Sequence, residues 1–143
     1  APVTPYALLC CNTYGGLSED NAHPEESYRP FDKKRSGFVI AEGAGIMVLE
    51  NVERAKSRKA NIAAVISGFG TTCDGIDRIN PDASGKELAR AINMALLEAK
   101  VRPEEIDFIS LDGLALDIWD TSEIKALKSV FGASLKKIPA SCP

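Results

Sequence analysis

The chain has 143 residues, of which 45% are hydrophobic and 26% charged, as in an ordinary globular protein. Its net charge of -3 gives no reason to expect nucleic acid as a partner, and no apolar run approaches the roughly 20 residues that a membrane-spanning helix needs. The 4 cysteines show neither a CxxC pair nor metal-ligand spacing, so we expect reduced thiols in a cytoplasmic protein without a metal site.

In chain order, the first half is predicted to form a short helix over residues 5–17 and a pair of strands over 37–50. A second helix over 51–59 and a buried strand over 62–72 follow. Gly15 and Gly16 end the first helix, and an acidic loop follows it. Asn51 suits the N-cap of the second helix, because its side-chain oxygen can accept from free backbone N–H groups. The last run is rich in β-branched residues, which favours a mostly buried strand.

A third helix is predicted from residue 84 onward. Ser84 and Glu87 have the spacing of a capping box, in which each side chain bonds the other's backbone. Apolar residues then recur on one stripe at helical spacing: Leu88, Ala91, Ile92, Ala95, Leu96 and Ala99. Residues 106–111, "IDFISL", predict the strand that follows.

A fourth helix and a final strand complete this half. Asp120 and Glu123 lie at the expected start of the helix, Gly132 ends it, and the strand begins within residues 136–141. The order helix, strand, helix, strand is typical of an α/β fold with helices layered on a mixed, largely parallel sheet.

Two short motifs favour packing over chemistry. "AEGAG" (41–45) lacks the glycine spacing of a phosphate loop and precedes a strand-like run, so we expect no nucleotide cofactor there. Cys10 and Cys11 come late in an apolar run, whereas a nucleophilic cysteine needs a helix N-terminus or a nearby histidine. The single histidine, His23, lies in a charged loop, where we expect it to be solvated.

Asp120 and Glu123 have two interpretations. They can be paired carboxylates for acid–base work, or a capping pair at the start of a helix, and the capping role is compatible with a polar network beside a site. Trp119, directly before them, is expected to pack or to form the wall of a pocket.

Several stretches resemble β-ketoacyl-acyl carrier protein synthases (ketosynthases): "RPFDKKRSGFVIAEGAGIMVLE", "ISGFGTTCDG", "GKELARAINMALLEA" and "IDFISLDG". The resemblance implies a thiolase-like fold of two similar halves. Residues 1–75 would end the first half, and residues 76–143 would begin the second, so we expect an incomplete fold in this chain. Members of that family use a cysteine nucleophile and two histidines for decarboxylative condensation.

The resemblance also implies departures at the catalytic positions. Asp112 occupies the place of the family's first histidine, and the residues after it replace two threonines and a proline: Leu114, Leu116 and Asp117. Asp120 and Glu123 are retained. The nucleophilic cysteine would lie upstream, while the motif's lysine and the second histidine would lie beyond Pro143, so this segment carries no catalytic residue.

Histidine and aspartate differ chemically at this position. The histidine presents an N–H to an oxygen that gains negative charge, whereas an ionised aspartate only accepts hydrogen bonds. Losing one such donor costs about 2.7–4 kcal/mol, or roughly 100- to 1,000-fold in rate. A protonated Asp112 could donate, but only strong burial would favour that form. We therefore expect no ketosynthase chemistry at this strand end.

A similar replacement is common in the chain length factor, the β-subunit that pairs with an active ketosynthase, and the final "IPASCP" also resembles that subfamily. By this resemblance the protein is a non-catalytic subunit that shapes an acyl pocket, with Cys11, Asp112 and Leu114 near the substrate. Its partners would be an active ketosynthase, or a second copy, and acyl carrier protein. The alternative is an atypical β-ketoacyl synthase with catalytic residues outside this segment.

Overall fold

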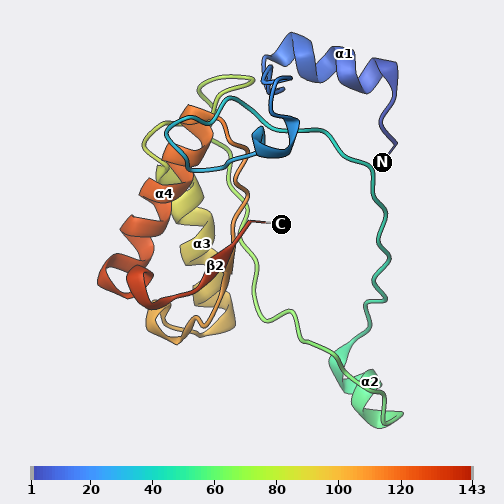
Figure 1. Cartoon of the computed structure of the whole chain (residues 1–143). Coiled ribbons are helices and arrows are strands. Elements are labelled where there is room, and N and C mark those ends of the chain that lie inside the picture. The colour runs from blue at the N-terminus through green and yellow to red at the C-terminus, as the bar shows by residue number, and fades with distance from the viewer. Residues whose placement is uncertain (1, 143) are drawn as a thin grey trace.

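The computed structural model describes residues 2–142. Its α-helices are α1 (Pro5–Tyr14), α2 (Val52–Ser57), α3 (Lys86–Ala99) and α4 (Asp117–Phe131), and its strands are β1 (Ile109–Ser110) and β2 (Ala140–Ser141). Three short 3-10 helices are η1 (Pro24–Glu26), η2 (Pro103–Glu105) and η3 (Gly132–Lys137). Figure 1 shows α3 and α4 side by side next to the strands, with α1 and α2 at the ends of extended segments.

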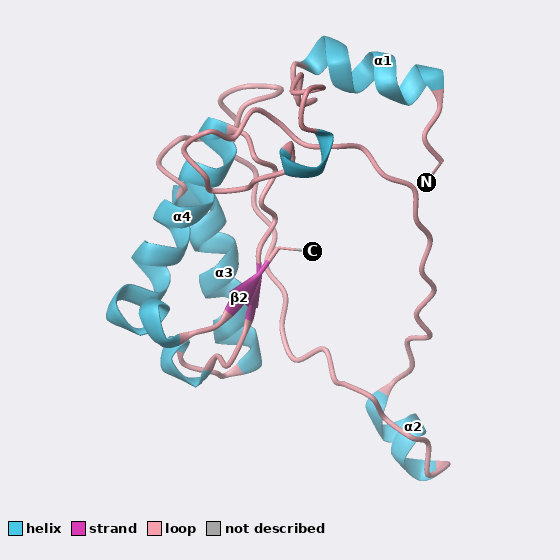
Figure 2. Cartoon of the chain, in the orientation of Figure 1, coloured by secondary structure: helices cyan, strands magenta, loops and turns pink. Residues whose placement is uncertain are grey.

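The two strands are parallel, as the order of elements predicted. Ile109 is in register with Ala140 and Ser110 with Ser141. The N–H of Leu111 donates to the carbonyl of Ser141 at 2.8 Å, so the pairing reaches the residue directly before Asp112. The first strand is shorter than the predicted 106–111, and α4 forms the crossover between the two strands (Figure 2).

The strands predicted at 37–50 and 62–72 do not form within the described residues. A strand requires a hydrogen-bonded neighbour at about 4.8 Å, and each of these runs is an extended trace without such a ladder; only Phe38 makes an isolated bridge, with Leu17. The second run is also largely exposed where burial was predicted, with Ile66 72% accessible. The runs have the apolar composition of strands, but residues 2–142 neither cover them nor pair with them in a ladder.

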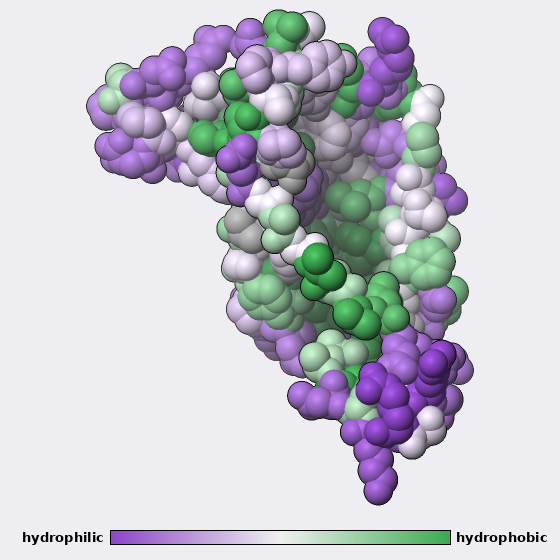
Figure 3. Space-filling model, turned by 90° about the vertical axis from the view of Figure 1, so that its right-hand side faces the viewer, coloured by the Kyte–Doolittle hydropathy of each residue, from purple (hydrophilic) through white to green (hydrophobic). Residues whose placement is uncertain are grey.

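These runs make one face of the molecule apolar. Figure 3 shows hydrophobic residues gathered around a hollow in that view. The exposed large side chains of the two runs are Val39, Ile46, Met47, Val48, Leu49, Ile62, Val65, Ile66 and Phe69. An apolar surface of this kind is typical of a layer that another element covers.

The predicted helices are present, but α3 starts differently from the prediction. Gly85, not Ser84, is its N-cap, with left-handed φ of 69° and no side-chain cap bond. Ser84 still accepts from the N–H of Lys86 at 3.3 Å, while its hydroxyl donates to Asp82 at 2.6 Å. The capping box is therefore wrong, because the glycine turn shifts the first helical residue and lets this corner pack against α4.

Three other predicted helix ends are confirmed, whereas α4 begins at Asp117 with Leu116 as its N-cap, before the predicted cap at Asp120. Gly15 ends α1 in the left-handed conformation, and Gly132 ends α4. The side chain of Asn51 accepts from the N–H groups of Glu53 and Arg54 and so caps α2.

Two glycines allow residues 62–72 to lie directly on α3. A Cβ at Gly68 would overlap the carbonyl oxygen of Ala95, and a Cβ at Gly70 would overlap that of Ala91. The small residues along this side of α3 therefore contact the backbone of residues 62–72 and not its side chains. This contact fixes α3 against the segment that leads into the cleft described below.

Gly70→Ala is expected to destabilise the full-length protein by about 1–3 kcal/mol, because the helix must move to admit one methyl group. The free energy of unfolding from urea denaturation measures the effect. Asn93→Ala, on the exposed side of the same helix, is the control and should change it by less than about 0.5 kcal/mol. Equal values for the two variants would contradict the close contact.

Candidate functional site

The turn after β1 is held by a side chain of α4. The two carboxylate oxygens of Glu123 accept from the backbone N–H groups of Asp112, at 2.9 Å, and Gly113, at 3.1 Å. Backbone donors at a strand end need acceptors once the ladder stops, and Glu123 supplies both. The residue predicted as half of a helix cap therefore anchors the turn instead.

Asp120 is buried, with 2% of its surface exposed, and it is also not a cap. It lies in the first turn of α4, and Leu116 is the N-cap. One carboxylate oxygen accepts from the N–H of Phe31 at 2.7 Å and lies 3.4 Å from Nε of Arg35. Asp120 therefore ties α4 to a segment distant in sequence, and this bond explains why its carboxylate points inward.

Phe31 needs that bond because its backbone is strained. Its φ of 65° is in the left-handed region, which a bulky residue rarely adopts. The hydrogen bond from Phe31 to Asp120 compensates for this conformation. Arg35, which also pairs with Asp117, adds a cation to the same cluster.

The opposite side of the turn faces Tyr28 and Cys142. The hydroxyl of Tyr28 donates to the carbonyl oxygen of Gly113 at 2.8 Å and lies 3.1 Å from the sulfur of Cys142. The sequence analysis did not single out either residue for this role. Their only sequence signals are their places immediately before "RPFD" and at the end of β2.

A cleft of about 400 Å³ opens beside the turn. Its lining combines carboxylates with apolar side chains: Thr72, Asp74, Pro81, Leu88, Asp112, Leu114, Trp119, Asp120, Ser122 and Glu123. The structure thus brings together Asp112, Leu114, Asp120 and Glu123, which the sequence singled out, and Trp119 lies in the wall of a pocket as one interpretation held. Asp112 is exposed at this cleft.

Cys11 lies elsewhere. It is half-buried on α1, its carbonyl accepts from Gly16 at 3.2 Å, and it does not line the cleft. Its role in substrate binding stays a prediction. All 4 cysteines are free thiols.

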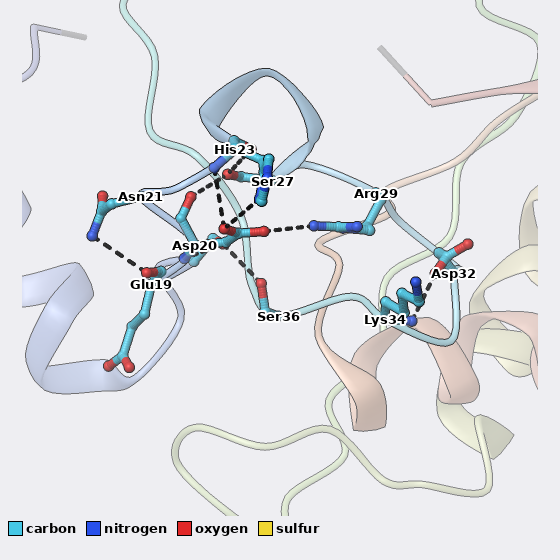
Figure 4. A network of polar contacts seen from close by, with 10 residues as sticks. Glu19, Asp20, Asn21, His23, Ser27, Arg29, Asp32, Lys34 and Ser36 are labelled. Atoms are coloured by element: carbon cyan, nitrogen blue, oxygen red, sulfur yellow. Dashed lines mark hydrogen bonds and ion pairs between the residues drawn. The ribbon is translucent and has the colours of Figure 1, made fainter.

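A second, polar pocket of about 440 Å³ lies between the loop that follows α1 and the segment that carries Lys34 and Ser36. Figure 4 shows its centre, where Asp20 pairs with Arg29 at 2.8 Å and accepts from the N–H of His23. The buried hydroxyl of Ser27 donates to the carbonyl oxygens of Asp20 and His23, at 2.7 and 3.0 Å. These bonds connect residues 20–29 to one another in the loop that leads directly to Tyr28. His23 is exposed, as predicted.

Within residues 2–142, no group of three or more His, Cys, Asp or Glu side chains is arranged to hold a metal ion. None of the helices in this part of the chain is long and apolar enough to cross a membrane.

Comparison with known proteins assigns the chain to a family. Residues 63–142 match the beta-ketoacyl synthase C-terminal domain, and residues 1–55 match the corresponding N-terminal domain. This chain belongs to the β-ketoacyl synthase family. The match confirms the resemblance seen in the sequence, and the predicted boundary between residues 75 and 76 stays a prediction.

A curated relative is the 3-oxoacyl-(acyl-carrier-protein) synthase 2 of Staphylococcus aureus. It is 37% identical over 141 residues, which is 99% of this chain and 35% of that protein, so the chain spans about a third of the relative's length.

Solved structures of ketosynthases have the same fold. One is a type II polyketide synthase acyl-carrier protein in complex with its ketosynthase bound to the hexaketide; the match has a TM-score of 0.90 and 35% identity over 98% of this chain and 35% of that chain. Another, the ishigamide ketosynthase/chain length factor, matches with a TM-score of 0.80 and 39% identity over 92% of this chain and 31% of that chain. The fold is therefore thiolase-like, and residues 2–142 show its helices and a small parallel sheet.

Mutation of Glu123 tests whether its two bonds to the backbone of Asp112 and Gly113 stabilise the turn. Glu123→Ala should destabilise the full-length protein by about 2 kcal/mol, because two backbone donors lose a charged acceptor. Thermal and urea denaturation measure the change.

Asp112→Ala is the matched control, since it removes an exposed carboxylate from the same turn and leaves both backbone bonds in place. It should change the free energy of unfolding by less than about 0.5 kcal/mol. A larger loss for Asp112→Ala than for Glu123→Ala would show that the anchor is misassigned.

Proposed function

We propose that this chain is part of a ketosynthase-like subunit of fatty acid or polyketide biosynthesis that does not itself catalyse condensation. It would be of the chain-length-factor type and would shape the acyl pocket in complex with an active ketosynthase. Acyl carrier protein would deliver the chain, and the complex would work in the cytoplasm.

The observation that carries this proposal is Asp112. The turn that bears it is anchored on the backbone by Glu123, independently of the side chain at position 112. In the ketosynthases that the sequence resembles, a histidine at this place donates to a developing oxyanion. An ionised aspartate only accepts hydrogen bonds and would repel that charge.

The side chain of Asp112 is exposed and lines the cleft, so the carboxylate is presented to whatever the cleft holds.

The apolar wall of the cleft supports a role in holding an acyl chain. Leu114 occupies a threonine position of the resembling enzymes, and Leu88 and Trp119 line the same cleft. Loss of hydroxyl groups and gain of apolar surface suit a chain without polar partners better than a charged intermediate.

The relatives point to both roles in the family. The ishigamide ketosynthase/chain length factor, at 39% identity, includes in its name the kind of subunit proposed here. The Staphylococcus aureus relative is named a synthase and is 37% identical to this chain. The alternative function is therefore that of an atypical condensing enzyme.

The full-length protein alone should form no covalent acyl adduct when incubated with acyl-loaded carrier protein, and no condensation product when malonyl-loaded carrier protein is added. Intact-protein mass spectrometry and product analysis provide the measurement. A stoichiometric cysteine thioester together with condensation product would show that the protein is an enzyme.

Leu114 should influence product length in a complex reconstituted with its ketosynthase. Leu114→Phe fills part of the cleft and is expected to shift products toward shorter chains, by one or more extension units. Leu97→Phe makes the same change outside the cleft and should leave the product profile as it was. Identical product profiles for the two variants would show that Leu114 does not help to set the product length.

A further inference from the structure

Tyr28 stands out among the residues around the cleft because neither the sequence pattern nor the resemblance explains it. It lies 85 positions from Gly113, yet its hydroxyl donates to the Gly113 carbonyl oxygen at 2.8 Å. It is held on one side by the loop network of Ser27 and Arg29 and on the other by the Asp120 bond to Phe31. Both neighbouring anchors restrict where the Tyr28 ring can lie.

Together with Glu123, Tyr28 completes a set of bonds around the turn. Glu123 accepts from both N–H groups, Tyr28 donates to the carbonyl oxygen of Gly113, and the Cys142 thiol lies 3.6 Å from the carbonyl oxygens of Asp112 and Gly113. Side chains therefore contact all four backbone polar groups of the two residues. A turn bonded from both sides has little freedom to rotate its peptide planes.

The tyrosine stays a donor at any physiological pH. The hydrogen bond with Cys142, followed by partial burial, raises the pKa of Tyr28 to about 12. The carboxylates of Asp120 and Asp112 act in the same direction, since a phenolate near them would be repelled. Because the range from pH 5 to pH 9 lies well below this value, the contact with Gly113 is not lost by titration of Tyr28 there.

The packing leaves no room for an alternative position. Gly113 has φ of 53°, and a Cβ there would overlap the sulfur of Cys142 and lie 3.1 Å from Cβ of Pro30. The turn is thus enclosed between β2 and the segment that carries Tyr28. Any shift of the Gly113 carbonyl would have to move this whole group.

We propose that Tyr28 is a positioning residue of the cleft. Its hydroxyl, supported by Cys142, fixes the Gly113 carbonyl and thereby the directions in which Asp112 and Leu114 leave the backbone. The importance of this for an acyl chain rests on the proposed function, but the positioning itself does not.

Hydrogen exchange of the full-length protein tests the positioning. In Tyr28→Phe, the amides of residues 112–115 should exchange about five- to tenfold faster, as loss of one hydrogen bond allows more frequent local opening. The amides of residues 88–98 in α3 should keep their rates. Unchanged exchange at 112–115, or the same acceleration in both regions, would overturn the proposal, since the second result means only general destabilisation.

Tyr6→Phe is the matched control. Tyr6 also contacts a cysteine, Cys10, but it lies on α1 with 76% of its surface exposed and away from the turn. Removal of its hydroxyl should leave exchange at 112–115 unchanged. If Tyr6→Phe has the effect of Tyr28→Phe, the proposal fails.

Product length in the reconstituted complex separates this inference from the proposed function. Tyr28→Phe is expected to broaden the range of chain lengths. Faster exchange at 112–115 with an unchanged product range would support the positioning by Tyr28 and count against the chain-length role of the cleft.

Discussion

The arrangement of the cleft depends on two carboxylates of α4 that bind backbone N–H groups. Glu123 binds the end of β1, and Asp120 binds Phe31. A charged acceptor for a backbone donor is stronger than a neutral one and restricts distance and direction together. Through these bonds, one helix fixes two segments that are distant in sequence, and the turn held by Glu123 forms one side of the cleft.

Much of the second half could be predicted from the sequence because its signals are local. The apolar stripe of α3 and the glycine after α4 mark helices that are present; α3 begins within one or two residues of the prediction and α4 ends at Gly132 as predicted, but α4 begins at Asp117, earlier than the predicted cap at Asp120. The parallel pairing of β1 and β2 follows from the helix between them. The first half was less predictable: the runs at 37–50 and 62–72 have the composition of strands, but a strand also needs a partner, which composition does not reveal.

The site was predicted in part. The resemblance located Asp112, and spacing singled out Asp120 and Glu123, but an acidic pair at this spacing suits a helix cap as well as a long-range anchor. The anchor depends on Phe31, 89 positions from Asp120, and on a backbone conformation that no residue pattern indicates. Tyr28 and Cys142 were missed for the same reason, since they are 114 positions apart and meet only in the folded chain. Pro143, part of the resemblance to chain length factors, lies outside the described residues.

Arg35 pairs with one buried and one exposed carboxylate of α4. Its guanidinium lies between two carboxylates, the buried Asp120 and Asp117, whose side chain is 91% exposed. Position 117 is a proline in the enzymes that the sequence resembles, so the Arg35–Asp117 pair is an addition on the solvent side, where ion pairs contribute little. Replacing Asp117 would therefore remove only an ion pair with an exposed carboxylate, whereas replacing Asp120 would also leave the N–H of Phe31 without its acceptor.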